Sequence, residues 1–403
     1  MGLFSKFFKK DAEIIDTPEK LANVLGAWYD TSSGIEITPG NALQIATVYQ
    51  CIKVLAESVG MLPISLMREV NDTKVKATDH ALFEILYTAP NDYMTAQEFK
   101  ELIVAHLCLR GNHYSYINRV GGRIAELLPL APGAVTPKLL GGAEVEYKVN
   151  FANGTVQTLG PNEIFHVKLM TIDGVTGLSP IAQGRHTIGL AKATEIHGSA
   201  LFKNGAQPSG GFKTEKTLSD DQYNRLKSSL TEKEGTENSF KPLILEGGLD
   251  WVSVAVTPQD AQYLETRKFQ RSDICGLFRV PPHKIGDLEK ATFSNIEHQG
   301  LEFVTDSLMP LLTRIENRVR LQLLTKDERK TLFAKFNANA LLRGDMKARA
   351  DFYTKMLQNG AMSPNEIRAK EDMNPREGGD IFLTPLNMAI NGKPQEEDNE
   401  NEK

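Results

Sequence analysis

The chain has 403 residues, of which 41% are hydrophobic and 24% are charged, as is usual for a globular protein with a sizeable core. Its net charge of −5 excludes a strong overall field for holding a polyanion, so any contact with nucleic acid must depend on local geometry or be weak and transient. The three cysteines are widely spaced and odd in number, which argues against a disulfide framework and for a reducing compartment.

The first segment, residues 1–40, shows no clear period, and we expect a flexible N-terminal segment. Its first ten residues could instead form a small amphipathic segment that docks on a partner or a membrane. No stretch of the chain approaches the ~20 apolar residues that span a bilayer, so we expect no membrane anchor.

Two helices are predicted in the first third of the chain. Apolar residues recur at steps of three and four over residues 42–59, which indicates one buried helical stripe. A second helix begins at Thr95, where Glu98 completes a capping box, and should end near Gly111. Residues 113–168 then change to short alternating runs, and Asn153-Gly154 suits a tight hairpin. We predict a mixed antiparallel sheet there.

A pair of helices is predicted at residues 181–204 and 258–278, with a small insert between them. The insert, residues 206–257, indicates a β-α-β-β order: a strand near Phe212, a helix opened by Ser219 and two strands at 243–245 and 251–256. Gly247-Gly248 suits the turn between the last two strands.

The C-terminal part starts with the longest periodic segment, residues 291–324, where Pro310 predicts a kink. A strand at 331–336 and a helix at 345–358 should follow. Ser363 and Glu366 form a capping box for a last short helix. Residues 388–403 are rich in acids and indicate a disordered acidic tail.

Motifs for catalysis or metal binding do not stand out. No phosphate-binding loop of the G-x-x-x-x-G-K-[ST] type occurs, and no histidine pair has the spacing of a helical zinc site. Gly177-Leu-Ser-Pro180 only faintly resembles a nucleophile elbow, so Ser179 is predicted to cap a helix. His106 is predicted to be a core histidine with its polar atoms satisfied. We therefore expect no enzyme, no cofactor and no metal.

The segment Ile274–Asn295 is a charged loop that follows Pro281-Pro282 between two helical segments. From Pro282 to Thr292 its charges, carried by Lys284, Asp287, Glu289 and Lys290, sum to zero, so this part is not a basic phosphate-binding patch. From the residues alone it is either a solvated connector or a functional loop.

Short landmarks in a fixed order give the chain a family resemblance from about residue 40 to residue 387. They are Pro90-Asn91, Gly111-Asn-His-Tyr114, Leu127-Leu-Pro-Leu130 with Pro132, Gly177-Leu-Ser-Pro180, Phe202-Lys-Asn-Gly205 with Pro208 and Gly210, Val280-Pro-Pro282, Asn365-Glu-Ile-Arg368 and Gly378-Gly-Asp380. In these landmarks the chain resembles the Hong Kong 97-like portal proteins of tailed double-stranded-DNA bacteriophages.

The resemblance implies an α+β portal fold assembled as a dodecameric ring. It implies a wing at residues 41–180, stem helices at 181–205 and 258–278, and an α/β clip at 206–257. A tunnel loop at 279–295, a long kinked helix with wing return at 296–344 and a short helical crown at 345–387 would follow.

The implied function is a conduit for double-stranded DNA at one capsid vertex, during packaging and ejection. The implied partners are the terminase large subunit, a head-tail adaptor, and the major capsid and scaffold proteins, with assembly in the host cytoplasm and a final place in the virion. Lys284 and Lys290 would lie nearest DNA, with Asp287 and Glu289 limiting their attraction. Trp251, Val252 and Val254 would form clip contacts with other subunits or partners, or else ordinary core.

Two other classes of protein remain as alternatives. A ring-forming nucleic-acid clamp or scaffold without a capsid role predicts a concentrated basic stripe, which the sequence lacks. A hydrolase built on Ser179 predicts a partnered histidine.

Overall fold

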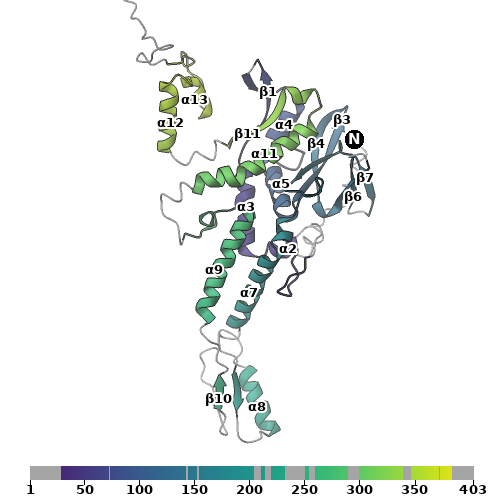
Figure 1. Cartoon of the computed structure of the whole chain (residues 1–403), viewed down its shortest axis with the longest axis vertical. Helices are drawn as coiled ribbons and strands as arrows, with labels where there is room; N and C mark the ends of the chain where they lie inside the picture. The colour runs from purple at the N-terminus through teal and green to yellow at the C-terminus, as the bar shows by residue number, and fades with distance from the viewer. Residues whose placement is uncertain are drawn as a thin grey trace, which may run out of the picture. The chain divides into compact units, whose positions relative to one another are not determined.

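The computed structural model describes residues 29–71, 73–141, 144–151, 154–203, 210–213, 219–231, 250–253, 259–288, 299–338, 346–371 and 373–383. The chain divides into two compact units, residues 1–337 and 338–403. Figure 1 shows the helices and strands of the first unit, which mixes both kinds of element. The α+β fold class predicted from the sequence is therefore confirmed at this level.

The centre of the first unit is helix α3 (Ala46–Gly60), which packs against α5 (Ala96–Arg110). The stripe predicted from periodicity is buried, with Val48, Ile52 and Leu55 at most 5% exposed. The predicted capping box of α5 is present, and Gly111 ends the helix at φ 72°, the left-handed conformation that glycine adopts without strain. Shorter helices accompany them: α2 (Pro39–Ala42), α4 (Ala81–Tyr87) and α6 (Pro180–Gln183).

The described part of the first unit contains three antiparallel sheets of three strands, in the orders β4-β3-β8, β5-β6-β7 and β11-β1-β2. The single sheet predicted for residues 113–168 is therefore wrong, because that stretch supplies two sheets. The strands are β1 (Ile64–Val70), β2 (Thr73–Lys76), β3 (Asn112–Val120), β4 (Arg123–Leu130), β5 (Val135–Leu139), β6 (Val145–Asn150), β7 (Val156–Leu159), β8 (Ile164–Lys168) and β11 (Leu332–Phe336).

Part of the N-terminal segment is ordered. Tyr29 and Ile37 form an antiparallel bridge, and Ile37 is fully buried. The backbone N–H of Ser32 donates to Nδ1 of His186 at 3.2 Å. The expectation of a flexible segment therefore does not hold for residues 29–40, and the earlier residues lie outside the described part.

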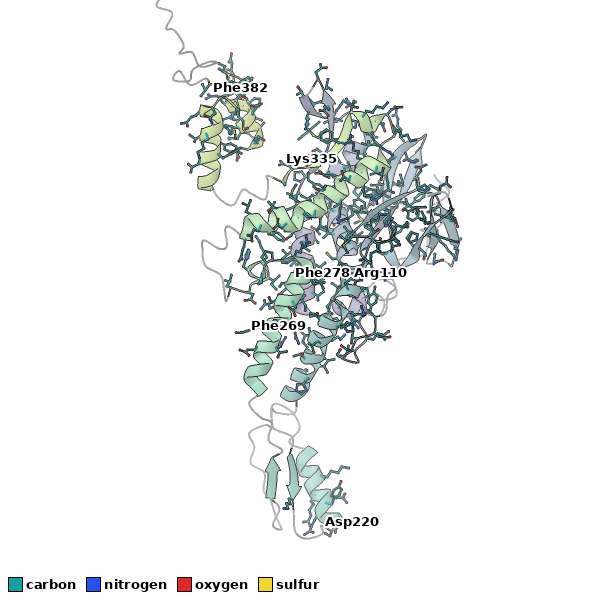
Figure 2. All side chains as sticks on the ribbon, in the orientation of Figure 1. Arg110, Asp220, Phe269, Phe278, Lys335 and Phe382 are labelled. Atoms are coloured by element: carbon teal, nitrogen blue, oxygen red, sulfur yellow. The ribbon has the colours of Figure 1, made fainter. Side chains whose placement is uncertain are left out.

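Helices α7 (Arg185–Lys203) and α9 (Gln259–Phe278) run side by side (Figure 1). Polar contacts join them: the guanidinium of Arg267 lies 3.5 Å from the carboxylate of Glu195, and Nε2 of Gln270 donates to Oγ1 of Thr194 at 3.0 Å. Figure 2 labels two phenylalanines of α9, of which Phe278 is 6% and Phe269 69% exposed. The C-terminal end of α9 is thus held in the core.

Between α7 and α9 in the chain lie β9 (Gly210–Lys213), α8 (Asp220–Thr231) and β10 (Asp250–Ser253). Strands β9 and β10 pair antiparallel, with Trp251 opposite Phe212 and Val252 opposite Gly211. These elements agree with the first, second and fourth parts of the predicted β-α-β-β order. The strand predicted at 243–245 lies outside the described residues.

The predicted long helix is not one regular α-helix. From residue 299 it passes into a π-helical segment (Phe303–Leu308), then α11 (Met309–Arg318), then a second π-helical segment (Val319–Leu323). Pro310 lies in the first turn of α11, where a missing backbone N–H costs least. The break in the hydrogen-bond pattern therefore precedes the proline. A short 3-10 turn, Glu328–Lys330, leads into β11.

The second unit contains two described helices, α12 (Met346–Gln358) and α13 (Pro364–Lys370). The predicted capping box is present, because Ser363 Oγ accepts from the Glu366 N–H and Glu366 accepts from the Ser363 N–H. Asn365 joins α13 to the following turn: its side chain accepts from the Arg376 N–H at 2.9 Å and donates to the Arg376 carbonyl at 3.0 Å. The predicted acidic tail lies outside the described residues.

Candidate functional site

The charged loop after α9 begins as an ordered turn. Arg279 follows the helix at φ 56°, and Pro282–Ile285 form a 3-10 turn that Gly286 ends in the left-handed conformation. The paired prolines set this geometry, since a proline suits the start of such a turn and cannot continue the helix. The described part of the loop, residues 279–288, is called the loop base below.

Arg271 of α9 anchors the loop base. Its Nη2 donates to the carbonyl oxygen of Ile285 at 3.0 Å, and its Nε lies 3.7 Å from the carboxylate of Asp287. These side chains are 36% and 25% exposed for Arg271 and Asp287, so water screens the ion pair in part. The contact fixes the turn to the side of the preceding helix.

A second contact joins the two ends of the loop. Nδ1 of His283 lies 2.7 Å from Oε1 of Gln299, at the start of the next described helix. The acceptor is a carbonyl-type oxygen, so Nδ1 of His283 carries the proton. The other ring nitrogen, Nε2, is buried without a hydrogen-bond partner among the described residues. The ammonium of Lys284 lies 5.5 Å from the centre of the Phe303 ring, within cation–π range.

An open cavity of about 790 Å³ lies between the end of α9, the loop base and the first π-helical segment. Ser307 closes part of its wall, with Oγ donating to the carbonyl of Arg279 at 2.5 Å. Its lining residues are Ser272, Cys275, Gly276, Arg279, Val280, Pro281, Pro282, Gln299, Glu302, Phe303, Thr305, Asp306, Ser307 and Pro310.

The predicted loop and clip residues are only partly described. Lys284 and Asp287 both belong to the loop base, where Lys284 is exposed and Asp287 faces Arg271. Trp251 and Val252 lie on β10. Glu289, Lys290 and Val254 lie outside the described residues. Arg271, Gln299 and Phe303 were missed from the sequence, because their partners are 14 or more residues away and no local pattern marks them.

Ser179 and His106 have the structural roles that the sequence predicts. Ser179 Oγ accepts from the Ala182 N–H at 3.2 Å and donates to the Leu109 carbonyl at 2.8 Å, so it caps α6. His106 is buried, with its Nδ1 3.0 Å from Nδ1 of His113. Where the chain is described, no group of three or more His, Cys, Asp or Glu could hold a metal ion. None of the described helices has both the length and the apolar character of a membrane span.

Two buried asparagine side chains join segments of the first unit that are far apart in the sequence. Asn112, 5% exposed, accepts from the Gly177 N–H at 2.7 Å and donates to the Gly177 carbonyl at 2.8 Å. Asn91 donates to the Leu127 carbonyl at 2.9 Å. These asparagines belong to the landmark motifs named above, so those motifs mark joints of the fold.

A cluster of three buried histidines lies beside Asn112 and consists of His106, His113 and His166. Nε2 of His166 donates to Oδ1 of Asn112 at 3.0 Å. Burial lowers the pKa of His106 to about 4 and, with the positive charges of Lys168 and Arg318, the pKa of His166 to about 3. Burial also lowers the pKa of His113 well below its usual value. The cluster is therefore neutral at pH 7.

Comparisons of the sequence with known proteins point to one family. A profile of the family described as "Phage portal protein" matches residues 46–372. The chain is 36% identical over 347 residues to the portal protein of Enterobacteria phage HK97, covering 85% of this chain and 81% of that protein. It is 30% identical over 379 residues to a probable portal protein of Streptomyces phage phiC31, covering 91% and 83% respectively.

Solved structures share the fold at lower identity. The neck of a native gene transfer agent particle, computed with C12 symmetry, contains a chain that matches with a TM-score of 0.57 at 22% identity, covering 88% of this chain and 98% of that chain. A crystal structure of an HK97-family phage portal protein from Corynebacterium diphtheriae matches with a TM-score of 0.56 at 18% identity, covering 75% and 96%.

Proposed function

The chain belongs to the phage portal protein family, and from this premise we propose that it forms a dodecameric ring at one capsid vertex, through which double-stranded DNA enters and leaves. The observation that carries the proposal is the match to the HK97 portal protein over 85% of this chain. The C12 symmetry of the particle neck that contains a chain of the same fold favours twelve copies. The ring would reside in the virion and be assembled in the host cytoplasm.

Each proposed part of the ring has a counterpart in the chain. We assign the sheets and helices up to residue 180 to the wing, α7 and α9 to the stem, and β9, α8 and β10 to the clip. The polar contacts between α7 and α9 support a stem of two helices that act as one support. The long helix after the loop would return the chain to the wing through β11, and α12 and α13 would form the crown.

The tunnel loop is the proposed contact with DNA. Lys284 is exposed on a turn that Arg271 joins to α9, and its charge would face the channel. Lys290 and Glu289 would lie further along the same loop. Since Asp287 already has Arg271 as a partner, its part in limiting the attraction of Lys284 for phosphate would be indirect. The zero net charge of residues 282–292 would let DNA slide past this part of the loop with small barriers.

Partner binding is assigned to the clip and the outer parts of the ring. The clip, with Trp251, Val252 and Val254, would contact neighbouring subunits, the terminase large subunit and later a head-tail adaptor. Major capsid and scaffold proteins would contact the wing. The role is mechanical rather than enzymatic, and the helix-capping geometry of Ser179 supports this, because its hydroxyl proton is committed to the Leu109 carbonyl.

Native mass spectrometry of the purified full chain tests the ring. We expect a species of twelve copies of the 44.6 kDa chain that persists on dilution. Rings of eleven or thirteen copies would correct the number alone, whereas a monomer or dimer at micromolar concentration would contradict the proposal.

The DNA contact is tested with the double variant Lys284→Ala/Lys290→Ala, in a phage whose own copy of the gene is deleted. We expect intact rings but a yield of DNA-filled particles reduced about tenfold or more. Lys138→Ala/Lys148→Ala removes two exposed lysines from β5 and β6 and should leave the yield unchanged. A normal yield of DNA-filled particles from the loop variant would contradict the assignment of the loop as the DNA contact. It would not contradict the proposed ring.

A further inference from the structure

The segment between β8 and α6, residues 169–177, is a loop with an apolar tip and is called the knob loop below. Its Ile172 is 83% exposed, the highest value for a large apolar side chain among the described residues, and Met170 is 62% exposed. Large apolar side chains that gather on one exposed tip are typical of a surface that another protein covers. The assignment of this segment to the wing does not by itself explain the tip.

Hydrogen bonds hold the knob loop in one shape. Oδ1 of Asp173 accepts from the backbone N–H groups of Val175 and Thr176 at 2.8 and 2.7 Å. The ammonium of Lys168, at the end of β8, donates to the carbonyl oxygen of Gly174 and, at 3.2 Å, to that of Val175. A loop that is already ordered loses little conformational entropy when it binds, so its apolar tip is suited to anchor a contact.

The cavity beside the loop base offers a surface that matches this tip. Phe303 and Val280, which are 4% and 3% exposed, form apolar parts of its wall together with Pro281 and Pro310. Its volume of about 790 Å³ lies in the range of pockets that enclose small ligands, so it has room for a methionine and an isoleucine side chain. Ile172 of the same chain does not fill the cavity, because that side chain is exposed.

The two surfaces also carry opposite charges. Arg279 lies on the cavity wall and is exposed. Asp173 is exposed next to Ile172, and hydrogen bonds from backbone N–H groups of its own loop lower its pKa, so it is negatively charged at pH 7. Because Glu302 and Asp306 also line the cavity, the carboxylate of Asp173 is expected on the Arg279 side of an inserted tip.

A second copy of the chain is a partner that presents this cavity to each knob loop. The knob loop leads into α6 and α7, whereas the cavity lies at the end of α9, and α7 and α9 run side by side (Figure 1). A contact between two different patches of identical chains is heterologous, and it generates a closed ring when the rotation between copies fits. The C12 symmetry of the particle neck that contains a chain of the same fold is a ring symmetry of this kind.

We propose that Met170 and Ile172 of one subunit insert into the cavity beside the loop base of the next subunit, with Asp173 of the first subunit beside Arg279 of the second. The inference rests on the proposed ring and names a contact that would close it. Since Pro281 lines the cavity, the inserted side chains would bring each loop base into contact with the neighbouring subunit.

Photo-cross-linking of the purified full chain tests the insertion, with p-benzoylphenylalanine in place of Ile172. Irradiation should yield covalently joined chains on a denaturing gel, and peptide mapping should join position 172 to a peptide within residues 272–310 of another chain. The same photoprobe in place of Val120, which is 65% exposed at the end of β3, should give about tenfold less of this product or none.

Two substitutions without added bulk test the charge contact. Asp173→Asn keeps the oxygen that accepts from the loop N–H groups but removes the charge, and Arg279→Gln removes the opposite charge. In native mass spectrometry, each variant should raise the concentration at which half of the rings dissociate about fivefold. The double variant should be no weaker than either single variant, because all three lose the same contact. Glu144→Gln, at an exposed position before β6, should leave that concentration unchanged.

The outcomes separate the insertion from the ring. Rings whose photoproduct joins residue 172 to its own chain, or to residues outside 272–310, would overturn the insertion and leave the proposed ring intact. Additive losses in the double variant would overturn the contact between Asp173 and Arg279. The absence of rings in the wild-type chain would overturn both the inference and the proposed function. If the photoprobe prevents assembly, the charge variants decide the question.

Discussion

Asn112 in the body and Arg271 at the loop base each join segments that are far apart in the chain, but water reaches them to different degrees. Asn112 is 5% exposed and binds both backbone groups of Gly177, whereas the Arg271 and Asp287 side chains are 36% and 25% exposed. A buried hydrogen bond is costly to lose because its partners stay unsatisfied, while a wet ion pair is replaced by water. The body is therefore held firmly, and the loop base can adjust.

The difference between buried joints and the wet loop base also explains which residues carried the family resemblance. The landmark asparagines that we can follow in the structure, Asn91, Asn112 and Asn365, each bind backbone groups at a joint between segments. Such joints tolerate few other side chains, because an amide both donates and accepts. The loop, in contrast, carries a proposed function with no residue pattern that would identify it alone.

The largest effect should come from acid acting on the buried histidine cluster. In the unfolded chain a histidine binds a proton below a pKa of ~6.5, but in the folded chain His106 and His166 bind one only near pH 4 and 3. Stability is thus present above pH 6.5 and is lost as the pH falls. Between pH 7 and pH 5 we expect a loss of about 2 kcal/mol for each of the two.

Urea unfolding at pH 7, 6 and 5 measures this loss. Ordinary carboxyl groups titrate lower, so this window reports mainly on histidines. Unchanged stability across it would show that the cluster is open to water, and the contrast between body and loop base would fail.

The next largest effect should come from Asn112→Ala. The substitution leaves the N–H and the carbonyl of Gly177 without partners and should cost about 3 kcal/mol of unfolding free energy, measured by urea titration. Asn118 lies on the same strand as Asn112, and Asn118→Ala removes a part-buried hydrogen bond to Glu126 of β4, which should cost about 0.5 kcal/mol. Equal losses of unfolding free energy for the two variants would contradict the claim that burial makes the hydrogen bonds of Asn112 the more stabilising ones.

The smallest effect should come from Arg271→Gln. Loss of the charged contacts to Ile285 and Asp287 should lower the free energy of opening the loop base by about 1 kcal/mol. It should barely change the free energy of global unfolding. Trypsin cleavage after Lys284 should then become about fivefold faster, because the loop base opens more often. Arg267 lies on α9 like Arg271 and pairs with Glu195 of α7, so Arg267→Gln removes an ion pair away from the loop base and should leave that cleavage rate unchanged. No difference between the two variants would show that Arg271 does not anchor the loop base.

Elements with signals inside a few residues were predictable from the sequence. The capping boxes at Thr95 and Ser363 gave the starts of α5 and α13, and the strand at 331–336 was found as β11 within one residue. Contacts between distant residues were not predictable, because no local rule brings Arg271 to Asp287 or His283 to Gln299. For the same reason the order of residues 29–40, which depends on contacts such as Ser32 to His186, was missed.

Electron cryomicroscopy of the purified full chain tests both the ring and the place of the loop in its channel. We predict a closed twelvefold ring in which α7 and α9 surround an open channel and the loop after Pro281-Pro282 points to its axis at the narrowest level. A ring whose loops face outward, or a particle without a channel, would contradict it.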